Sequence, residues 1–415
     1  MGRTATFRSL ILATAVIASG TLVSADWNEG LAAFNAENYQ VAGEHFTEII
    51  RTNPSWAGGY YMLGRCQSKL NQGIQAVESL RKAYDLGPSD ADVVIAYSQA
   101  LMSEDKFAET REVLESADTG TMTPVLRSQA SILLAEALLG EDDAMAAVEV
   151  LEECLGEEKA DPAIYRTLGK AQAETGDREG AMRSFAKAFE LDPDELSGEA
   201  AIRTALSLAG AVLDAEKKTH WYRQALHVAA QLATSFPSAE HDLMAGRAAL
   251  GAQELEAAEQ SFLAALSKNE NDAEAWYFLG RSFSGLDRDD EAYDAYSAAL
   301  DATPDDTLTR RIHGRMGQIA ACSLDLETAV GHYRSAQKAE RAQEIQTLAT
   351  QFAGALAQLE QLRATVHEIQ QMERQLDELG DVQGVNAMRE RAAAERTKID
   401  EIEDNLGAVR SALCR

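Results

Sequence analysis

A small residue returns along this chain at intervals close to 34 residues, and this spacing constrains the fold more than any other feature. Successive copies are separated by 34, 34, 37, 34, 44, 33, 34 and 37 residues. A unit this short cannot bury its own apolar face, so the interval indicates copies stacked side by side. The repeated positions are Ala42, Ala76, Thr110, Ala147, Ala181, Ala225, Ala258, Ala292 and Ala329.

A bulky apolar residue follows the small one by four positions, which puts both on the same face of a helix. Ala229 is the one small residue at this second position. The others are Phe46, Leu80, Leu114, Leu151, Phe185, Phe262, Tyr296 and Tyr333. In five units a proline, which cannot continue a helix, stands twelve residues after the small residue. We therefore expect one such helix in each unit.

The segment 273–304 shows what precedes that helix. Trp276, Leu279, Gly280 and Phe283 follow at helical spacing, so they share one face of an earlier amphipathic helix. The glycine carries no side chain and lets a second helix backbone approach closely. The same glycine recurs as Gly64, Gly169, Gly246 and Gly317. Each unit is therefore predicted to be a pair of helices joined by a turn, here at 285–287.

This pattern resembles the tetratricopeptide motif, in which W-x2-L-G-x2-Y is followed by A-x3-F and then by P over 34 residues. The resemblance extends over 26–338. It implies an all-α fold, a right-handed α-solenoid of about nine helix pairs. The 44-residue interval before Ala225 predicts an extended first helix or an inserted loop near 194–199. A bend between two halves of the array is expected there, near 194–200.

The apolar pattern changes after Tyr333. Apolar residues between Ile345 and Leu376 alternate at spacings of three and four, which is typical of a coiled-coil seam. A second seam runs from Val385 to Leu413, interrupted by Glu395. We expect 339–415 to form a coiled-coil helical hairpin that turns at Gly380, with homo-oligomerisation through 339–415 as a further expectation.

The first residues predict a secretory signal peptide over 1–25. Two arginines precede an apolar stretch at 10–23, and small residues then favour cleavage between Ala25 and Asp26. No other stretch is apolar enough for a stable membrane span. The protein is therefore expected to be exported, to the periplasm or the extracellular space. The sequence has no acceptor sequon for N-glycosylation, which favours a bacterial periplasm.

Charge and motifs argue against several function classes. The net charge of −29 disfavours nucleic acid, whose phosphates require a basic surface. The seven histidines lack metal-ligand spacing, and the phosphate-binding and nucleophile motifs are missing from the sequence. We therefore predict no enzyme activity, no cofactor and no metal. Cys66, Cys154 and Cys322 belong to non-adjacent units and predict no disulfide, while a cross-link between two chains through Cys414 stays open.

In the tetratricopeptide family, ligands bind the surface that the first helices line together. By the helical period, the residues three before and one after the glycine position should face this surface. The predicted partner-binding residues are Tyr61, Arg65, Ile95, Gln99, Arg166, Lys170, Arg247, Tyr277 and Arg281, with Leu243 beside them. Four units place a basic residue directly after the glycine, in an otherwise acidic chain.

Two interpretations of this basic row remain open. The cations hold an acidic peptide or a C-terminal carboxylate, or they pair internally with neighbouring Glu and Asp. The sequence thus predicts a non-enzymatic scaffold that binds a partner protein or peptide. The alternatives are a self-assembling oligomer of the cell envelope built through 339–415, and a regulatory arm for an enzyme on another chain.

Overall fold

The protein is described by a computed structural model that covers residues 20–87, 89–157, 161–379 and 381–413. Within these ranges the secondary structure is helical, without a strand. The chain divides into two compact units, 1–208 and 209–415, and each is described by itself. The division falls inside the helix α11 (Glu195–Ala211). Residues 1–19 of the predicted signal peptide and Cys414 lie outside the described residues, and nothing in the structure bears on cleavage after Ala25.

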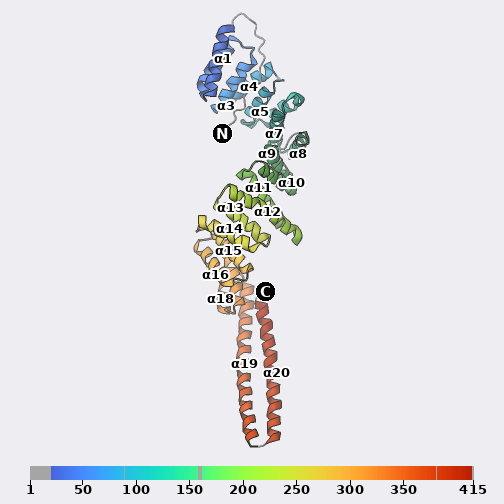
Figure 1. Ribbon diagram of the computed structural model, residues 1–415, viewed down its shortest axis with the longest axis vertical. Helices are drawn as coiled ribbons and strands as arrows, with labels where there is room; N and C mark the ends of the chain where they lie inside the picture. The colour runs from blue at the N-terminus through green and yellow to red at the C-terminus, as the bar shows by residue number, and fades with distance from the viewer. Residues whose placement is uncertain (1–19, 88, 158–160, 380, 414–415) are drawn as a thin grey trace. The chain divides into compact units, whose positions relative to one another are not determined.

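Unit 1 consists of successive helix pairs, each packed on the next (Figure 1). Its helices are α1 (Gly20–Asn35), α2 (Tyr39–Thr52), α3 (Ala57–Lys69), α4 (Gly73–Leu86), α5 (Ala91–Met102), α6 (Phe107–Glu115), η1 (Thr119–Thr121), α7 (Pro124–Gly140), α8 (Ala144–Glu157), α9 (Pro162–Thr175) and α10 (Arg178–Leu191). The first helices α3, α5, α7 and α9 also pack on one another in sequence, which creates the shared surface that the repeat pattern predicts.

Unit 2 continues the same arrangement and ends in a helical hairpin (Figure 1). The helix α11 (Glu195–Ala211) crosses the division between the units. The helices that follow it are α12 (Ala215–Ser235), α13 (Ala239–Gly251), α14 (Leu255–Lys268), α15 (Ala273–Gly285), α16 (Asp289–Asp301), α17 (Asp306–Cys322), α18 (Leu326–Ser335), α19 (Ala339–Glu378) and α20 (Val382–Leu413). Counted over the described residues, unit 1 holds five successive pairs in α1 to α10 and unit 2 holds three in α13 to α18, while α11 and α12 take the place of the sixth pair in the sequence.

The small repeated residues lie at the centre of each pair. All nine, from Ala42 to Ala329, are completely buried, and the residues four positions later are at most 7% exposed. Glycine is required at the facing position. A Cβ on Gly64 would lie 2.5 Å from the Leu80 side chain, and one on Gly169 would lie 2.8 Å from the Phe185 ring. The predicted close approach of helices is therefore confirmed.

The sixth pair shows where the extra residues of the 44-residue interval go. Residues 195–199 already belong to α11, so the alternative of an inserted loop at 194–199 is wrong. The extended first helix is right only in part, because α11 has 17 residues against 14 in α9. Most of the extra length lies at the start of the second helix α12, where Ala225 is the eleventh residue, whereas Ala181 is the fourth residue of α10. Asp194 starts α11 by accepting a hydrogen bond from the Ser197 backbone N–H at 2.9 Å.

The hairpin of α19 and α20 is antiparallel. Arg363 pairs with Glu403 and Arg389 pairs with Glu373, so residue numbers rise on one helix as they fall on the other. The seam residues are buried or half-buried, and Glu395 within the seam pairs with Lys398 at 3.1 Å.

The end of the hairpin returns to the last helix pair. Leu413 and Ile345 are completely buried in a cluster with Ala321, Ala329 and Tyr333 of α17 and α18. The hairpin thus covers the apolar end of the array, which a stacked repeat requires. In the described part of the chain, no helix combines the length and apolar character needed to cross a membrane.

Candidate partner-binding grooves

The predicted residues of the second and third repeats, both in unit 1, come together in one groove. Tyr61 and Arg65 of α3 face Ile95 and Gln99 of α5 across an open cavity of about 610 Å³. Leu126 and Gln129 of α7 close its far side. Ile95 is buried, Gln99 is exposed and the two α3 residues are half-buried. We call this site the α3–α5 groove.

Aromatic rings hold the Arg65 guanidinium in place. Its central carbon lies 4.8 Å from the Phe34 ring centroid and 5.4 Å from the Tyr61 centroid, within the range of cation–π attraction. Asp92 lines the opposite wall, and its burial raises the pKa of that carboxyl. Burial likewise raises the pKa of Tyr61. With Lys69 and Glu104, which also line it, the groove therefore offers two cations, two carboxyls and a phenol hydroxyl to a ligand.

Arg166 is engaged within the protein. Its Nη2 donates to Asp194 Oδ2 at 3.1 Å and its Nε donates to Ser197 Oγ at 3.1 Å. Both partners sit at the start of the following first helix, α11. Internal pairing is therefore the interpretation that fits Arg166. Lys170, one turn later on α9, is exposed.

In unit 2 the predicted residues meet around one aromatic ring. Arg247 is exposed, pairs with Glu274 at 3.6 Å and lies 5.3 Å from the Phe278 centroid. Arg281 lies 5.6 Å from the same centroid. Tyr277 is only 3% exposed, so its ring packs into the protein and offers little surface to a ligand.

A second site, missed by the sequence reasoning, lies next to Arg281. A cavity of about 600 Å³ is lined by Tyr277 and by five cations, which come from α15, from α17 and from the residue that caps the start of α19. The cations, which we call the basic pocket, are Arg281, Arg310, Arg311, Arg315 and Lys338. The run Arg310-Arg311 followed by Arg315 in an acidic chain was a signal that could have revealed it.

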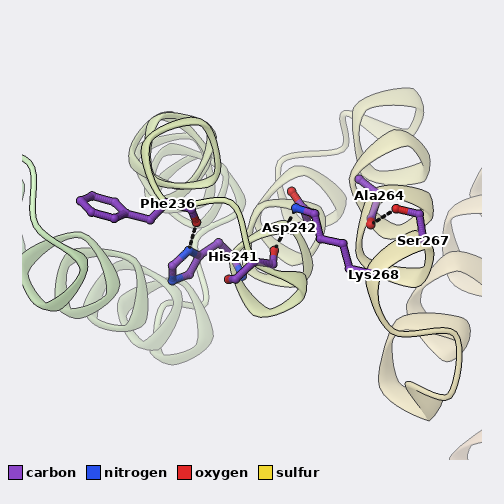
Figure 2. A network of polar contacts seen from close by, with 7 residues as sticks. Phe236, His241, Asp242, Ala264, Ser267 and Lys268 are labelled. Carbon is purple, nitrogen blue, oxygen red and sulfur yellow. Dashed lines mark hydrogen bonds and ion pairs between the residues drawn. The ribbon is translucent and has the colours of Figure 1, made fainter.

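A polar network in the α12–α14 region has a structural role. The His241 ring Nδ1 lies 2.5 Å from the Phe236 carbonyl oxygen at the end of α12, and Lys268 Nζ of α14 lies 2.5 Å from Asp242 Oδ2 (Figure 2). His241 is 3% exposed and Asp242 is 9% exposed. These contacts tie α13 to both neighbouring helices. Buried polar groups of this kind are satisfied by partners within the fold.

Two further histidines, on α17 and α18, lie close together. His313 Nδ1 is 3.0 Å from His332 Nδ1, and the Tyr293 hydroxyl is 3.0 Å from His332 Nε2. Within the described ranges, no group of three or more His, Cys, Asp or Glu side chains is arranged to hold a metal ion. Cys66 and Cys154 are buried free thiols, and burial raises the pKa of Cys66 to about 11.

Comparison with known proteins supports the repeat. Tetratricopeptide repeat family models match residues 57–90 and 163–195 in unit 1 and residues 243–307 in unit 2. No curated protein sequence matches the chain.

Several solved structures are similar in fold. A tetratricopeptide repeat protein from Parabacteroides merdae is 13% identical, with a TM-score of 0.42, and the match covers 64% of this chain and all of that one. Pseudomonas aeruginosa pilF is 19% identical, with a TM-score of 0.42, over 57% of this chain and 96% of that one. The crystal structure of MamA is 22% identical, with a TM-score of 0.33, over 43% of this chain and 96% of that one.

Proposed function

We propose that this protein is an exported, non-enzymatic scaffold that binds a partner protein or peptide on the surface of its first helices. The observation that carries the proposal is the α3–α5 groove. It joins side chains from successive repeats into one open, polar and aromatic site. A groove that crosses repeat boundaries suits an extended polypeptide, because each repeat contributes contacts to a different ligand residue.

Export is supported by the sequence at 1–25, which carries a charged start, an apolar stretch and small residues before Asp26. N-terminal sequencing of the protein from its native host tests this part of the proposal. A mature chain that begins at Asp26 supports it, and a chain that retains the leader contradicts it.

Partner binding is tested by affinity capture from the native host. The double variant Tyr61→Ala/Arg65→Glu removes the aromatic wall and reverses the positioned charge. The matched control is Arg81→Glu, an exposed residue on the second helix α4. We expect the double variant to lose the captured partner and the control to keep it. Equal capture by both variants would falsify the proposal.

One observation favours the second candidate, self-assembly through the hairpin. Leu379 and Val382 at its tip are 80% and 69% exposed. Exposed apolar residues on a helical tip can be covered by a second copy. Light scattering on the wild type and on Leu379→Lys/Val382→Lys tests this. A dimer that becomes a monomer in the variant supports self-assembly, and a monomeric wild type rules it out.

A further inference from the structure

We propose that the basic pocket binds a run of consecutive carboxylates in a partner polypeptide. This inference rests on the proposed function and adds a ligand class at a different site on the first-helix surface. The pocket combines five cations with one aromatic wall, in a chain whose net charge is −29. Such a concentration of one sign costs repulsion energy unless an opposite charge is present.

The cations of the pocket are not neutralised within the protein. Arg166 and Arg247, which lie on the first helices of other repeats, each pair with a carboxylate from the next repeat. By contrast, none of the five pocket cations has a carboxylate oxygen within 4 Å among the residues that the structure describes. The recorded polar contacts of Arg310 and Arg315 are with the amides of Gln337 and Gln318.

Two features shape the pocket for a ligand. Gly314 occupies the place, three before the glycine position, where other units carry Tyr61, Leu243 or Tyr277. Its missing side chain opens the cavity, and Lys338 Nζ lies 3.0 Å from where a Cβ would stand. The central carbon of the Arg311 guanidinium lies 4.7 Å from the Tyr277 ring centroid, within the range of cation–π attraction, which holds the group against this wall. An oriented guanidinium favours bidentate binding of a carboxylate.

The extent of the site favours a polypeptide over a single small anion. A second cavity of about 370 Å³ shares Arg281, Arg315 and Gln318 with the basic pocket, so the two cavities flank the same side chains. A ligand several residues long can contact both. A nucleic acid strand carries its charges well beyond the pocket, and a protein whose net charge is −29 would repel them. A short acidic run avoids that repulsion.

Fluorescence anisotropy with labelled synthetic peptides tests the proposal directly on the full protein. One peptide carries a run of glutamates, the second has glutamine at the same positions, and the third has phosphoserine there. We expect the glutamate peptide to bind, the glutamine peptide to bind at least about tenfold more weakly, and added salt to weaken binding. Tighter binding of the phosphoserine peptide would support the same anionic-oxygen recognition and identify phosphate as the preferred source.

The variant Arg311→Glu/Arg315→Glu should weaken glutamate-peptide binding about tenfold or more. Its control is Arg391→Glu/Arg396→Glu, which makes the same charge change at exposed positions of α20. Gly314→Leu, a change to the residue found at Leu243, fills the cavity without altering charge and should also weaken binding. Circular dichroism and thermal unfolding confirm that each variant is folded.

Three results would overturn the proposal: equal binding by the pocket and control variants, equal binding of the glutamate and glutamine peptides, or binding of an oligonucleotide in place of the peptide. Failure here is distinguishable from failure of the proposed function. If the acidic peptide does not bind but partner capture still depends on Tyr61 and Arg65, the scaffold function stands and only the ligand class of the basic pocket is wrong.

Discussion

The ring of Tyr296 fills the space that Gly280 leaves open. A Cβ built on Gly280 would lie 2.7 Å from the Tyr296 Cε1, closer than such atoms approach in proteins. Tyr296 is completely buried, so the ring cannot move away without disturbing its neighbours. The same relationship joins Gly246 to Phe262 and Gly64 to Leu80. In these pairs one glycine and one bulky residue thus set how closely the two helices pack.

Substituting Gly280 with Ala should therefore lower the free energy of unfolding by about 1–3 kcal/mol, since an added atom overpacks the pair. Gly354→Ala on α19 is the matched control, because a Cβ there meets no atom within 4 Å among the described residues. That change should raise stability by about 0.5–1 kcal/mol through helix propensity. The midpoints of urea unfolding of the two variants test this prediction. Equal shifts of the midpoint in Gly280→Ala and Gly354→Ala would contradict the packing account.

The hairpin is expected to stabilise the end of the array through Ile345, which is completely buried against the last helix pair. Ile345→Ala should cost about 2–5 kcal/mol, as for other large-to-small changes in a packed core. Leu379→Ala, at an 80% exposed position of the same hairpin, should change stability by less than about 0.5 kcal/mol. Thermal unfolding measures both. If Ile345→Ala is as mild as Leu379→Ala, the hairpin does not cap the array.

Asp194 has two roles that two substitutions can separate. It pairs with Arg166 and accepts a backbone hydrogen bond at the start of α11. Asp194→Asn keeps a capping oxygen and should cost less than about 1 kcal/mol, because the pair is partly exposed. Asp194→Ala removes the cap as well and should cost about 1 kcal/mol more. Chemical denaturation distinguishes them, and identical losses would show that the cap contributes nothing.

The paired histidines predict a loss of stability in acid. Burial lowers the pKa of both His313 and His332 below the ordinary value of 6.5, and their proximity lowers that of His332 further, while Asp325 opposes the shift. Because the folded state resists protonation, this stabilisation is present above about pH 6.5 and is lost as pH falls. His313→Gln should reduce the loss between pH 7 and pH 5.

His367→Gln, an exposed residue of α19, is the control for this effect and should retain the wild-type pH dependence. Unfolding free energies at several pH values provide the measurement. A wild type that is equally stable at pH 5 and pH 7 would show that the histidine pair does not contribute.

The repeat could be predicted well from the sequence because small and bulky residues alternate in it at a fixed spacing. The small residue at Ala292 and the glycine at Gly280 must recur wherever two helices touch, so their spacing alone located the pairs. The hairpin was equally visible, since its seam has its own spacing from Ile345 onward.

The site was less predictable, because pairing partners come from neighbouring units. Asp194 stands 28 residues after Arg166, and Glu274 stands 27 residues after Arg247, so no local pattern revealed that these cations are neutralised. The basic pocket was not predicted, because most of its residues lie outside the pattern of the repeat. Lys338 belongs to the start of the hairpin, and Arg311 and Arg315 lie outside the positions that the repeat assigns to its ligand surface.

Cross-linking with mass spectrometry in the native host tests the central claim, that partners bind the first-helix surface. Lys69 lines the α3–α5 groove, Lys170 lies on the first helix α9 and Lys338 lines the basic pocket, whereas Lys82 and Lys187 are on the second helices α4 and α10. We predict that partner cross-links concentrate at the first three lysines. Cross-links confined to Lys82 and Lys187 would contradict the account.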